Sequence, residues 1–377
     1  MKPSTPKIAL HLPGGGARGA YQVGALQAIG EICDSSKTSP FHIYTGISAG
    51  AINAAVMASH ADDFLHGVQR LSSFWRNMRC HHIYRTDWTD VLASMARWTA
   101  AALFGRFGVR APAALLNTSP LRALLQRETS LQRISDLIDN GDLESIAVSA
   151  SGYSTGTAVS FFQSTASKVW HRGRRVGRRA TLTVDHLMAS TALPLLFPPQ
   201  KIRQEYFGDG GLRQTAPLST PIHLGADRIL IISARDATEN PEPKESPRCP
   251  SAGEIAGHLL DIVFMDNLDA DVERLDRVNE TLQHLTAEKR SENDLRIVDT
   301  LAIRPSQDLR ALVAEYATQM PASVKMLLAG VGAWGSDHRL ASYLLFEQDY
   351  CQALMSLGYR DAIDQKDEIQ DLMLANS

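Results

Sequence analysis

Short apolar runs alternate with longer stretches of helical periodicity over the first sixty residues. Lys7–Leu12 and Phe41–Ile47 are apolar segments of strand length, each bounded by glycine and polar residues. Ala20–Cys33 and the segment Gly50–His60 space their apolar residues as helices do. This strand–helix–strand–helix order predicts a parallel sheet with helices packed on its faces, and therefore an α/β protein.

The pattern further along the chain predicts more strands and then a helical region. Residues 62–127 are mostly helical in pattern, and residues 145–164 give two strands joined by a turn at Gly152–Gly156. The remaining predicted elements are a helix at Val184–Ser190, strands at Gln204–Phe207, Asp227–Ser233 and Leu295–Ile303, and helical stretches over Glu254–Lys289 and from Ser306 almost to the end.

Composition divides the chain into three parts. Residues 236–253 are rich in Pro, Glu, Ser and Lys, which predicts an exposed linker. We therefore expect a core domain at 5–235, the linker at 236–253 and a mainly helical C-terminal region at 254–377 that contributes one strand at 295–303.

Charge and cysteine content narrow the range of functions. The 377 residues carry a net charge of −3, which gives no general signal for nucleic acid. The four cysteines are far apart and form neither a C-x-x-C pair nor a metal-type Cys/His spacing, which favours a reducing compartment and no metal. The first apolar run is too short for a signal peptide, and no window reaches the roughly 18 apolar residues of a spanning helix. We expect a cytoplasmic protein, with peripheral attachment to a membrane as the other option.

The loop after the first predicted strand has two interpretations. Gly14, Gly16 and Gly19 match the G-x-G-x-x-G spacing of dinucleotide-binding loops, and a helix is predicted to begin directly after them. The amides of such a loop and the helix N-terminus attract any anion, including the oxyanion of ester hydrolysis. The loop by itself leaves both interpretations open.

The end of the second predicted strand favours ester hydrolysis. A dinucleotide-binding fold needs a carboxylate there, but FHIYTGI has none, and Asp34 lies in the turn before it. The chain instead has Gly46, Ser48 and Gly50 in a G-x-S-x-G pattern between a predicted strand and a predicted helix. This is the pattern of a nucleophile elbow, whose glycines allow the sharp turn that exposes the serine hydroxyl. The alternative is that both loops are tight turns in a nucleotide-binding or purely structural sheet.

A serine nucleophile requires a base, and the sequence offers two kinds. His186, His223 and His338 follow the elbow, but none lies in a clear loop directly after a predicted core strand. Asp209 follows a short strand inside the segment GDGG, where glycines allow a close approach to another loop. An ordinary D-G turn explains this aspartate equally well.

Four motifs together make the chain resemble the patatin-like phospholipase family. They are GGGARG at 14–19, GISAG at 46–50, ASTALPLLFPP at 189–199 and DGG at 209–211, in that family's order and within roughly residues 7–235. A weaker similarity to bacterial members is the segment LASYLLF at 340–346. The resemblance implies a three-layer α/β/α fold with a mainly parallel central sheet.

The resemblance also implies roles for individual residues. Ser48 would be the nucleophile and Asp209 the base of a Ser–Asp dyad that needs no histidine, metal or cofactor. Arg18 would fix the glycine loop or its charge environment. The other implied site residues are Gly14, Gly15, Gly16, Ala17 and Gly19 in an oxyanion hole, with the amides of Gly15 and Gly16 as the best candidates, Gly46 and Gly50 at the elbow, and Gly210 and Gly211 in the DGG motif.

The function implied by the resemblance is a serine lipid acyl hydrolase of phospholipase A or lysophospholipase type that forms an acyl-serine intermediate. Its substrate would be a lipid or another ester. A general carboxylesterase or acyltransferase with the same dyad is the alternative, and a non-enzymatic nucleotide-binding protein is disfavoured.

Two further segments bear on the substrate. Six basic residues between Lys168 and Arg179 suit peripheral contact with anionic lipid head groups, although a solvated loop is the simpler expectation. The apolar segment Trp88–Leu116 could line or cover an acyl channel, but an ordinary pair of core helices is favoured.

Overall fold

The computed structural model describes residues 6–33, 38–104, 106, 108, 112–235, 249–262, 267–286, 289, 295–330, 332–334 and 338–374. The predicted position of Asp34 and most of the predicted linker, residues 236–248, lie outside these ranges. The strands are β1 (Ile8–Leu12), β2 (Ile43–Ile47), β3 (Ser145–Gly152), β4 (Ala158–Ser164), β5 (Trp170–Arg172), β6 (Arg175–Arg179), β7 (Gln200–Ile202), β8 (Glu205–Asp209), β9 (Arg228–Ile232) and β10 (Asp299–Ile303).

The helices follow the same numbering along the chain. They are α1 (Gly19–Ile32), α2 (Ala49–Ala58), α3 (Phe64–Arg76), α4 (Cys80–Ile83), α5 (Trp88–Phe104), α6 (Ser119–Glu128), α7 (Arg133–Asn140), α8 (Val184–Ser190), α9 (Ser219–Leu224), α10 (Ala252–Asp261), α11 (Asn267–Gln283), α13 (Leu309–Tyr316), α14 (Ala322–Gly330), α15 (Arg339–Leu344), α16 (Gln348–Asp364) and α17 (Lys366–Leu374), with short 3-10 turns η1 (Gly16–Arg18), η3 (Gly210–Leu212) and η5 (Ala317–Gln319).

All the strands of the described residues join one sheet. Its main order is β10-β9-β1-β2-β3-β4-β6-β5, and β8 pairs with both β3 and β7. The five strands from β10 to β3 in this order are parallel to one another. Consequently the loops after β1 and β2, which carry the first two motifs, lie next to each other at the carboxyl ends of the parallel strands.

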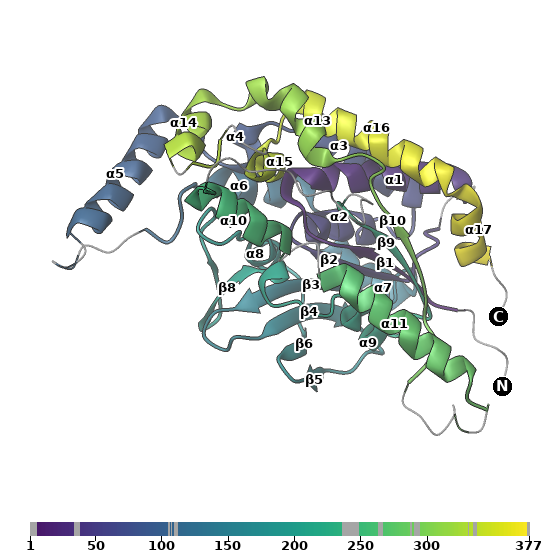
Figure 1. Ribbon diagram of the computed structural model, residues 1–377. Helices are drawn as coiled ribbons and strands as arrows, with labels where there is room; N and C mark the ends of the chain where they lie inside the picture. Colours follow the sequence, from purple (N-terminus) through teal and green to yellow (C-terminus); the bar gives the residue numbers. More distant parts are fainter. Residues whose placement is uncertain are drawn as a thin grey trace.

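Helices cover both faces of the sheet (Figure 1). Side chains alternate between the two faces along β1, because a strand has a period of two residues. Leu10 and Leu12 belong to the core under α1, whereas Ala9 belongs to a separate core that includes Leu275 of α11. The sheet therefore forms the middle layer of a three-layer α/β/α structure, and the predicted fold class is confirmed.

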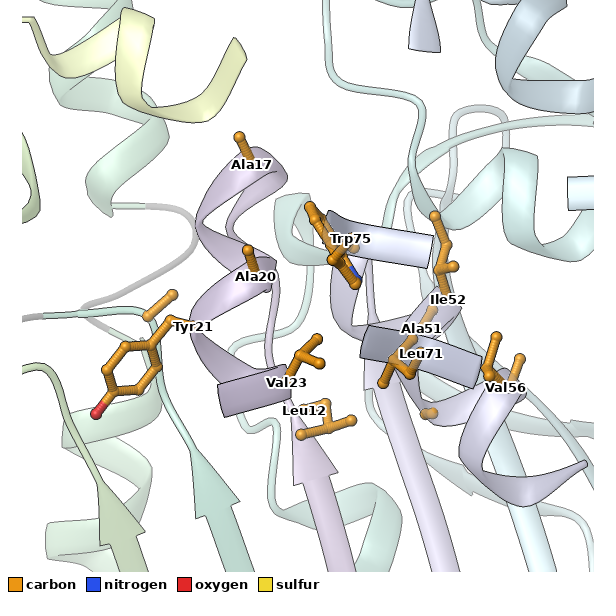
Figure 2. Close-up of a cluster of buried hydrophobic side chains, with 14 of the residues drawn as sticks. Leu12, Ala17, Ala20, Tyr21, Val23, Ala51, Ile52, Val56, Leu71 and Trp75 are labelled. Atoms are coloured by element: carbon orange, nitrogen blue, oxygen red, sulfur yellow. The ribbon is translucent and has the colours of Figure 1, made fainter. Parts of the chain in front are cut away.

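The larger core joins the elements that follow the first two motifs. Figure 2 shows side chains of β1, α1, α2 and α3 gathered in it, among them Trp75. The indole Nε1 of Trp75 donates to Asn53 Oδ1 (2.8 Å), and Asn53 Nδ2 donates to the Gly19 carbonyl (3.0 Å) and to Gln22 Oε1 (2.8 Å). These buried bonds connect the first turn of α1 to α2, so the two motif loops share a rigid base.

The C-terminal part of the chain packs directly on this core. β10 extends the sheet beside β9, and α16 lies along α1. The two helices are very close, since a Cβ on Gly24 would lie 1.8 Å from the Met355 carbonyl oxygen. The division of the chain into domains at residues 235 and 254 stays a prediction.

Several elements differ from the sequence predictions. The basic run forms the antiparallel pair β5–β6 at the sheet edge, which the pattern did not predict because its apolar residues are too few. Helix α5 is not part of a buried helix pair, since Leu92 and Leu103 are 51% and 66% exposed. The last strand begins at Asp299, and none of the helices in the described ranges has the length and hydrophobicity needed to cross a bilayer.

Candidate active site

Ser48 occupies a strained turn between β2 and α2. Its backbone has φ 55° and ψ −128°, a left-handed conformation that is uncommon for a residue with a side chain. The flanking glycines are required by close packing: a Cβ on Gly46 would lie 2.4 Å from the Gly50 carbonyl oxygen, and one on Gly50 would lie 2.0 Å from that of Leu12. The geometry is that of a nucleophile elbow, as the G-x-S-x-G pattern predicts.

The pairing of β3 brings Asp209 to this turn. One side of β3 pairs with β4, and the other side pairs first with β2 and then with β8. Ile47, the last residue of β2, is opposite Ser149, and Asp209, the last residue of β8, is opposite Ala150. The two strands therefore lie end to end along β3, and Ser48 and Asp209 meet where they end.

The carboxyl group of Asp209 is buried and only half satisfied. Its Oδ1 accepts the amide hydrogen of Gly211 (2.9 Å), whereas Oδ2 has no hydrogen-bond partner among the described residues. Burial raises the pKa of Asp209 to about 7, although the nearby Ser48 hydroxyl and the Gly211 amide lower it. The Ser48 hydroxyl thus lies near the carboxyl group without making a hydrogen bond of standard geometry to Oδ2.

One segment holds both residues in place. Ser190 Oγ accepts the amide hydrogen of Ser48 (2.9 Å) and donates to the Ser149 carbonyl (2.7 Å). Two residues later, the Ala192 carbonyl accepts the amide hydrogen of Asp209 (2.9 Å). The start of the segment 189–199 therefore fixes the relative position of the elbow and the aspartate.

The glycine loop lies beside the elbow. Residues 14–19 are all buried, and a Cβ on Gly19 would be 3.0 Å from that of Ala49, the residue after Ser48. Gly16 has φ +57° and leaves no room for a side chain, because its Cβ would lie 2.3 Å from the Tyr343 carbonyl oxygen. In the described part of the chain, no acceptor takes the amide hydrogens of Gly15 and Gly16. These amides can serve an oxyanion.

Arg18 attaches the glycine loop to the C-terminal part of the chain. Its guanidinium group is buried and donates from Nε and Nη2 to Ser342 Oγ (2.9 and 2.6 Å). It also lies 4.2 Å from the centre of the Tyr343 ring, and Nη2 is 3.6 Å from Asp261 Oδ1. The Tyr343 hydroxyl donates to the same oxygen (2.6 Å), so α10 and α15 together hold the loop.

The three loops meet at one small cavity of about 10 Å³. It is lined by Gly14 before the loop turn, Ile47 before the elbow and Gly211 after the aspartate. The structure thus brings together the glycine loop, the elbow and the DGG motif. Gly210 is required in this motif because its Cβ would lie 2.3 Å from the Ser149 carbonyl oxygen.

The three candidate histidines have other surroundings. The ring of His186 bonds Thr183 through Nδ1, that of His223 bonds Ser219, and that of His338 lies against Trp334. Within the described residues, none of the three bonds Ser48, and no group of three His, Cys, Asp or Glu side chains is arranged to hold a metal ion.

The chain matches one known protein family over much of its length. A family model described as patatin-like phospholipase matches residues 10–222, which is more than half of the chain. The chain belongs to the patatin-like phospholipase family. It is therefore an ester-hydrolysing enzyme, as the motifs predicted, and the matched region contains all four motifs.

Three solved structures that the chain is similar to are distant from it in sequence. VipD from Legionella pneumophila is 12% identical over 93% of this chain and 67% of its own, with a TM-score of 0.35. The type III effector ExoU of Pseudomonas aeruginosa is 14% identical over 98% of this chain and 54% of its own (TM-score 0.39). Human GIVD cytosolic phospholipase A2 is 11% identical over 98% of this chain and 59% of its own (TM-score 0.45). This chain thus spans 54% to 67% of their lengths, and no curated protein sequence matches it.

Sequence reasoning missed the residues that support the site from behind. Ser190 belongs to the motif at 189–199, but nothing in the sequence indicated that it bonds the Ser48 amide. Ser342 and Tyr343 lie in the segment LASYLLF, which had no assigned role, and Asp261 had no signal at all. These contacts join residues far apart in sequence, and no periodic pattern reports such pairs.

We expect Ser190→Ala to reduce both stability and ester hydrolysis. The change leaves the Ser48 amide and the Ser149 carbonyl unpaired in the interior, at about 1–3 kcal/mol for each group. The elbow should then shift, and hydrolysis of a p-nitrophenyl ester should fall by roughly tenfold or more. Ser356→Ala is the matched control, because its exposed hydroxyl only bonds a carbonyl of its own helix. Equal rates and melting temperatures for both variants would refute the supporting role of Ser190.

Proposed function

We propose that this chain is a serine lipid acyl hydrolase with a Ser48–Asp209 dyad, of the phospholipase A or lysophospholipase type. The observation that carries the proposal is the fully buried Asp209, with a free Oδ2, beside a serine in a strained elbow. A carboxyl group with a pKa near 7 is poised to accept and return a proton at neutral pH.

In the acylation step, Ser48 Oγ attacks the ester carbonyl carbon while its proton passes to Asp209 Oδ2. The tetrahedral intermediate carries its negative charge on the former carbonyl oxygen. When the intermediate collapses, the bond to the alcohol oxygen breaks and Asp209 protonates the leaving alcohol. The product of this step is an acyl ester on Ser48.

The amides of Gly15 and Gly16 are the proposed donors to the oxyanion. The turn that presents them is held by Arg18 and its C-terminal partners, so the donors are in place before the charge develops. Preorganised donors of this kind typically contribute about 10²–10³ in rate each. Arg18 itself is bonded to Ser342 and is proposed to position the loop.

In the deacylation step, Asp209 takes a proton from water as the water oxygen attacks the acyl-serine carbonyl. The second tetrahedral intermediate expels Ser48 Oγ, which regains its proton from Asp209. A fatty acid leaves, and no cofactor is consumed. An acyltransferase would use another alcohol instead of water, and a general carboxylesterase would use the same steps on a shorter acyl group.

The buried position of the dyad bears on how a lipid reaches it. Ser48 is 2% exposed, so an ester reaches its hydroxyl only when neighbouring groups move. Peripheral contact with an anionic membrane is part of the proposal, supported by the exposed basic residues of 168–179 and by the exposed Val169 among them. Co-sedimentation with anionic vesicles that does not weaken with salt would count against this contact.

We expect Ser48→Ala and Asp209→Asn each to abolish ester hydrolysis without unfolding the protein. Ser48→Ala removes the nucleophile, and Asp209→Asn keeps the shape of the side chain but removes the base. A fluorophosphonate probe should label the wild type, should not label Ser48→Ala, and should label Asp209→Asn much more slowly. Long-chain esters should be preferred over short ones if the substrate is a lipid.

The control for these variants is Asp139→Asn, which changes an exposed aspartate. Wild-type activity in Asp209→Asn would exclude the dyad and favour one of the candidate histidines as the base. Activity confined to short-chain esters would instead favour the general carboxylesterase.

The pKa of Asp209 sets the expected pH dependence. The base must be ionised, so kcat/KM should rise about tenfold for each pH unit below pH 7 and level off above it. The pKa of Asp209 in the folded protein, about 7, lies above the ordinary 3.8, so folding favours the protonated carboxyl group. This contribution to the free energy of unfolding is complete below about pH 4 and is lost as the pH rises to about 7. Asp209→Asn should remove this pH dependence of stability. A rate that stays flat between pH 5 and 9 would contradict the assignment of Asp209 as the base.

A further inference from the structure

A second cavity, of about 650 Å³, lies on the face of the sheet that carries α9 and α11. It is bounded by the β5–β6 pair, by α9, by α11 and by residues just before β10. Figure 1 shows α9, β5 and β6 near one another, beside and below α11. Cavities of this size commonly hold small-molecule ligands. None of the motif residues lines it.

The floor of this cavity is apolar. Leu218, Ile222, Leu275, Val278 and Val298 line it, and they come from three separate segments of the chain. Leu218, Leu275 and Val298 are also members of the core on this face of the sheet. A hydrocarbon chain placed here would replace water against a rigid surface.

The rim of the cavity is basic. Arg172 and Arg175 reach it from the β5–β6 pair, Arg274 from α11, and Arg296 from the segment before β10. Burial lowers the pKa of His223, and the charges of Arg172, Arg175 and Arg296 lower it further. These guanidinium groups therefore converge on one ring at the edge of the cavity.

The carboxylate of Asp271, which also lines the cavity, is already hydrogen-bonded. Asp271 is buried, and its two oxygens accept the Leu218 amide (2.9 Å) and Arg274 Nη1 (3.2 Å). Arg296 donates to two backbone carbonyls and lies 3.9 Å from Asp227. Across the described ranges, no acidic side chain pairs with Arg172 or Arg175. Asp271 lies close enough to Arg175 for their charges to interact, but neither Arg172 nor Arg175 has a direct acidic partner among the described residues at the cavity rim.

Helix α11 connects this cavity to the active site. Its first residues, Asn267 and Leu268, line the small cavity between Gly14 and Ile47. Further along the same helix, Leu275 and Val278 form part of the apolar floor. A ligand in the larger cavity would therefore contact the helix that closes one side of the catalytic loops.

We propose that this cavity binds a single-chain anionic amphiphile, with its hydrocarbon on the apolar floor and its head group against Arg172 and Arg175. Arginine binds carboxylates and phosphates through paired hydrogen bonds, so a long-chain carboxylate and a monoacyl phosphate share the required chemistry. The carboxylate is the product of the proposed hydrolysis, and that choice of source rests on the proposed function. The binding itself does not depend on it.

The test is a calorimetric titration of the Ser48→Ala protein with oleate, at concentrations below the critical micelle concentration of oleate. In this background, Arg172→Gln with Arg175→Gln should weaken oleate binding at least about tenfold, because two charge-assisted contacts are lost. Arg174→Gln with Lys201→Gln is the matched control: it removes the same charge from exposed residues that do not line this cavity. The control should change the affinity by less than about threefold.

Further ligands distinguish a carboxylate from a phosphate head group, and test the apolar floor and the two arginines separately. Monoacyl glycerol phosphate in place of oleate shows whether phosphate is preferred, while octanoate and oleyl alcohol should bind weakly because each lacks one part of the ligand. Equal affinity of oleate for the two double variants would overturn the proposal, as would binding of oleyl alcohol as tight as that of oleate. If the Arg172→Gln, Arg175→Gln variant loses vesicle binding while its oleate binding is unchanged, these arginines contact a membrane surface instead.

The experiment separates this site from the proposed activity. Oleate binding to Ser48→Ala with no hydrolysis by the wild type would leave the site standing and remove the proposed function. Hydrolysis by the wild type without oleate binding would do the reverse.

Discussion

The active site depends on how one strand is paired. β3 accepts β2 along the first part of one edge and β8 along the rest, and these two partners run in opposite directions. Their ends therefore meet, and each end carries one member of the proposed dyad. No long-range loop has to find its position, because the hydrogen bonds of β3 set the register of both partners. A slip of one residue in either ladder would turn Ser48 or Asp209 away from the other.

Burying the carboxyl group of Asp209 has an electrostatic cost, which neighbouring groups of the site partly offset. A carboxyl group with one unpaired oxygen in the interior disfavours its charged form, which is why the pKa of Asp209 is raised. The Gly211 amide offsets part of that cost, and the Ser190 hydroxyl satisfies the backbone of the strained elbow. Backbone strain of the kind seen at Ser48 and an unpaired buried oxygen such as Oδ2 of Asp209 are common at functional sites.

Much of this could be predicted from the sequence, for identifiable reasons. The strands and helices around Ser48 follow from short apolar runs and glycine punctuation, and β1, α1, β2 and α2 lie close to their predicted limits. The basic hairpin β5–β6 could not be predicted, because it pairs at a sheet edge where few apolar residues are needed. The meeting of Ser48 and Asp209 through the pairing of β3 could not be predicted either, since register across distant strands has no local signal. The same holds for the exposed face of α5, whose apolar sequence alone suggested burial.

The bond between Arg18 and Ser342 spans 324 positions of the chain. A ribosome completes the elbow, the aspartate and the segment that joins them long before it reaches Ser342. During that interval the glycine loop lacks its guanidinium acceptor, and Gly16 lacks the neighbouring backbone of Tyr343. A nascent chain would therefore carry its nucleophile with an unsupported loop until Ser342 and Tyr343 have been synthesised and α15 has folded. The long reach of this contact thus makes support of the glycine loop depend on the synthesis of α15, more than 300 residues later.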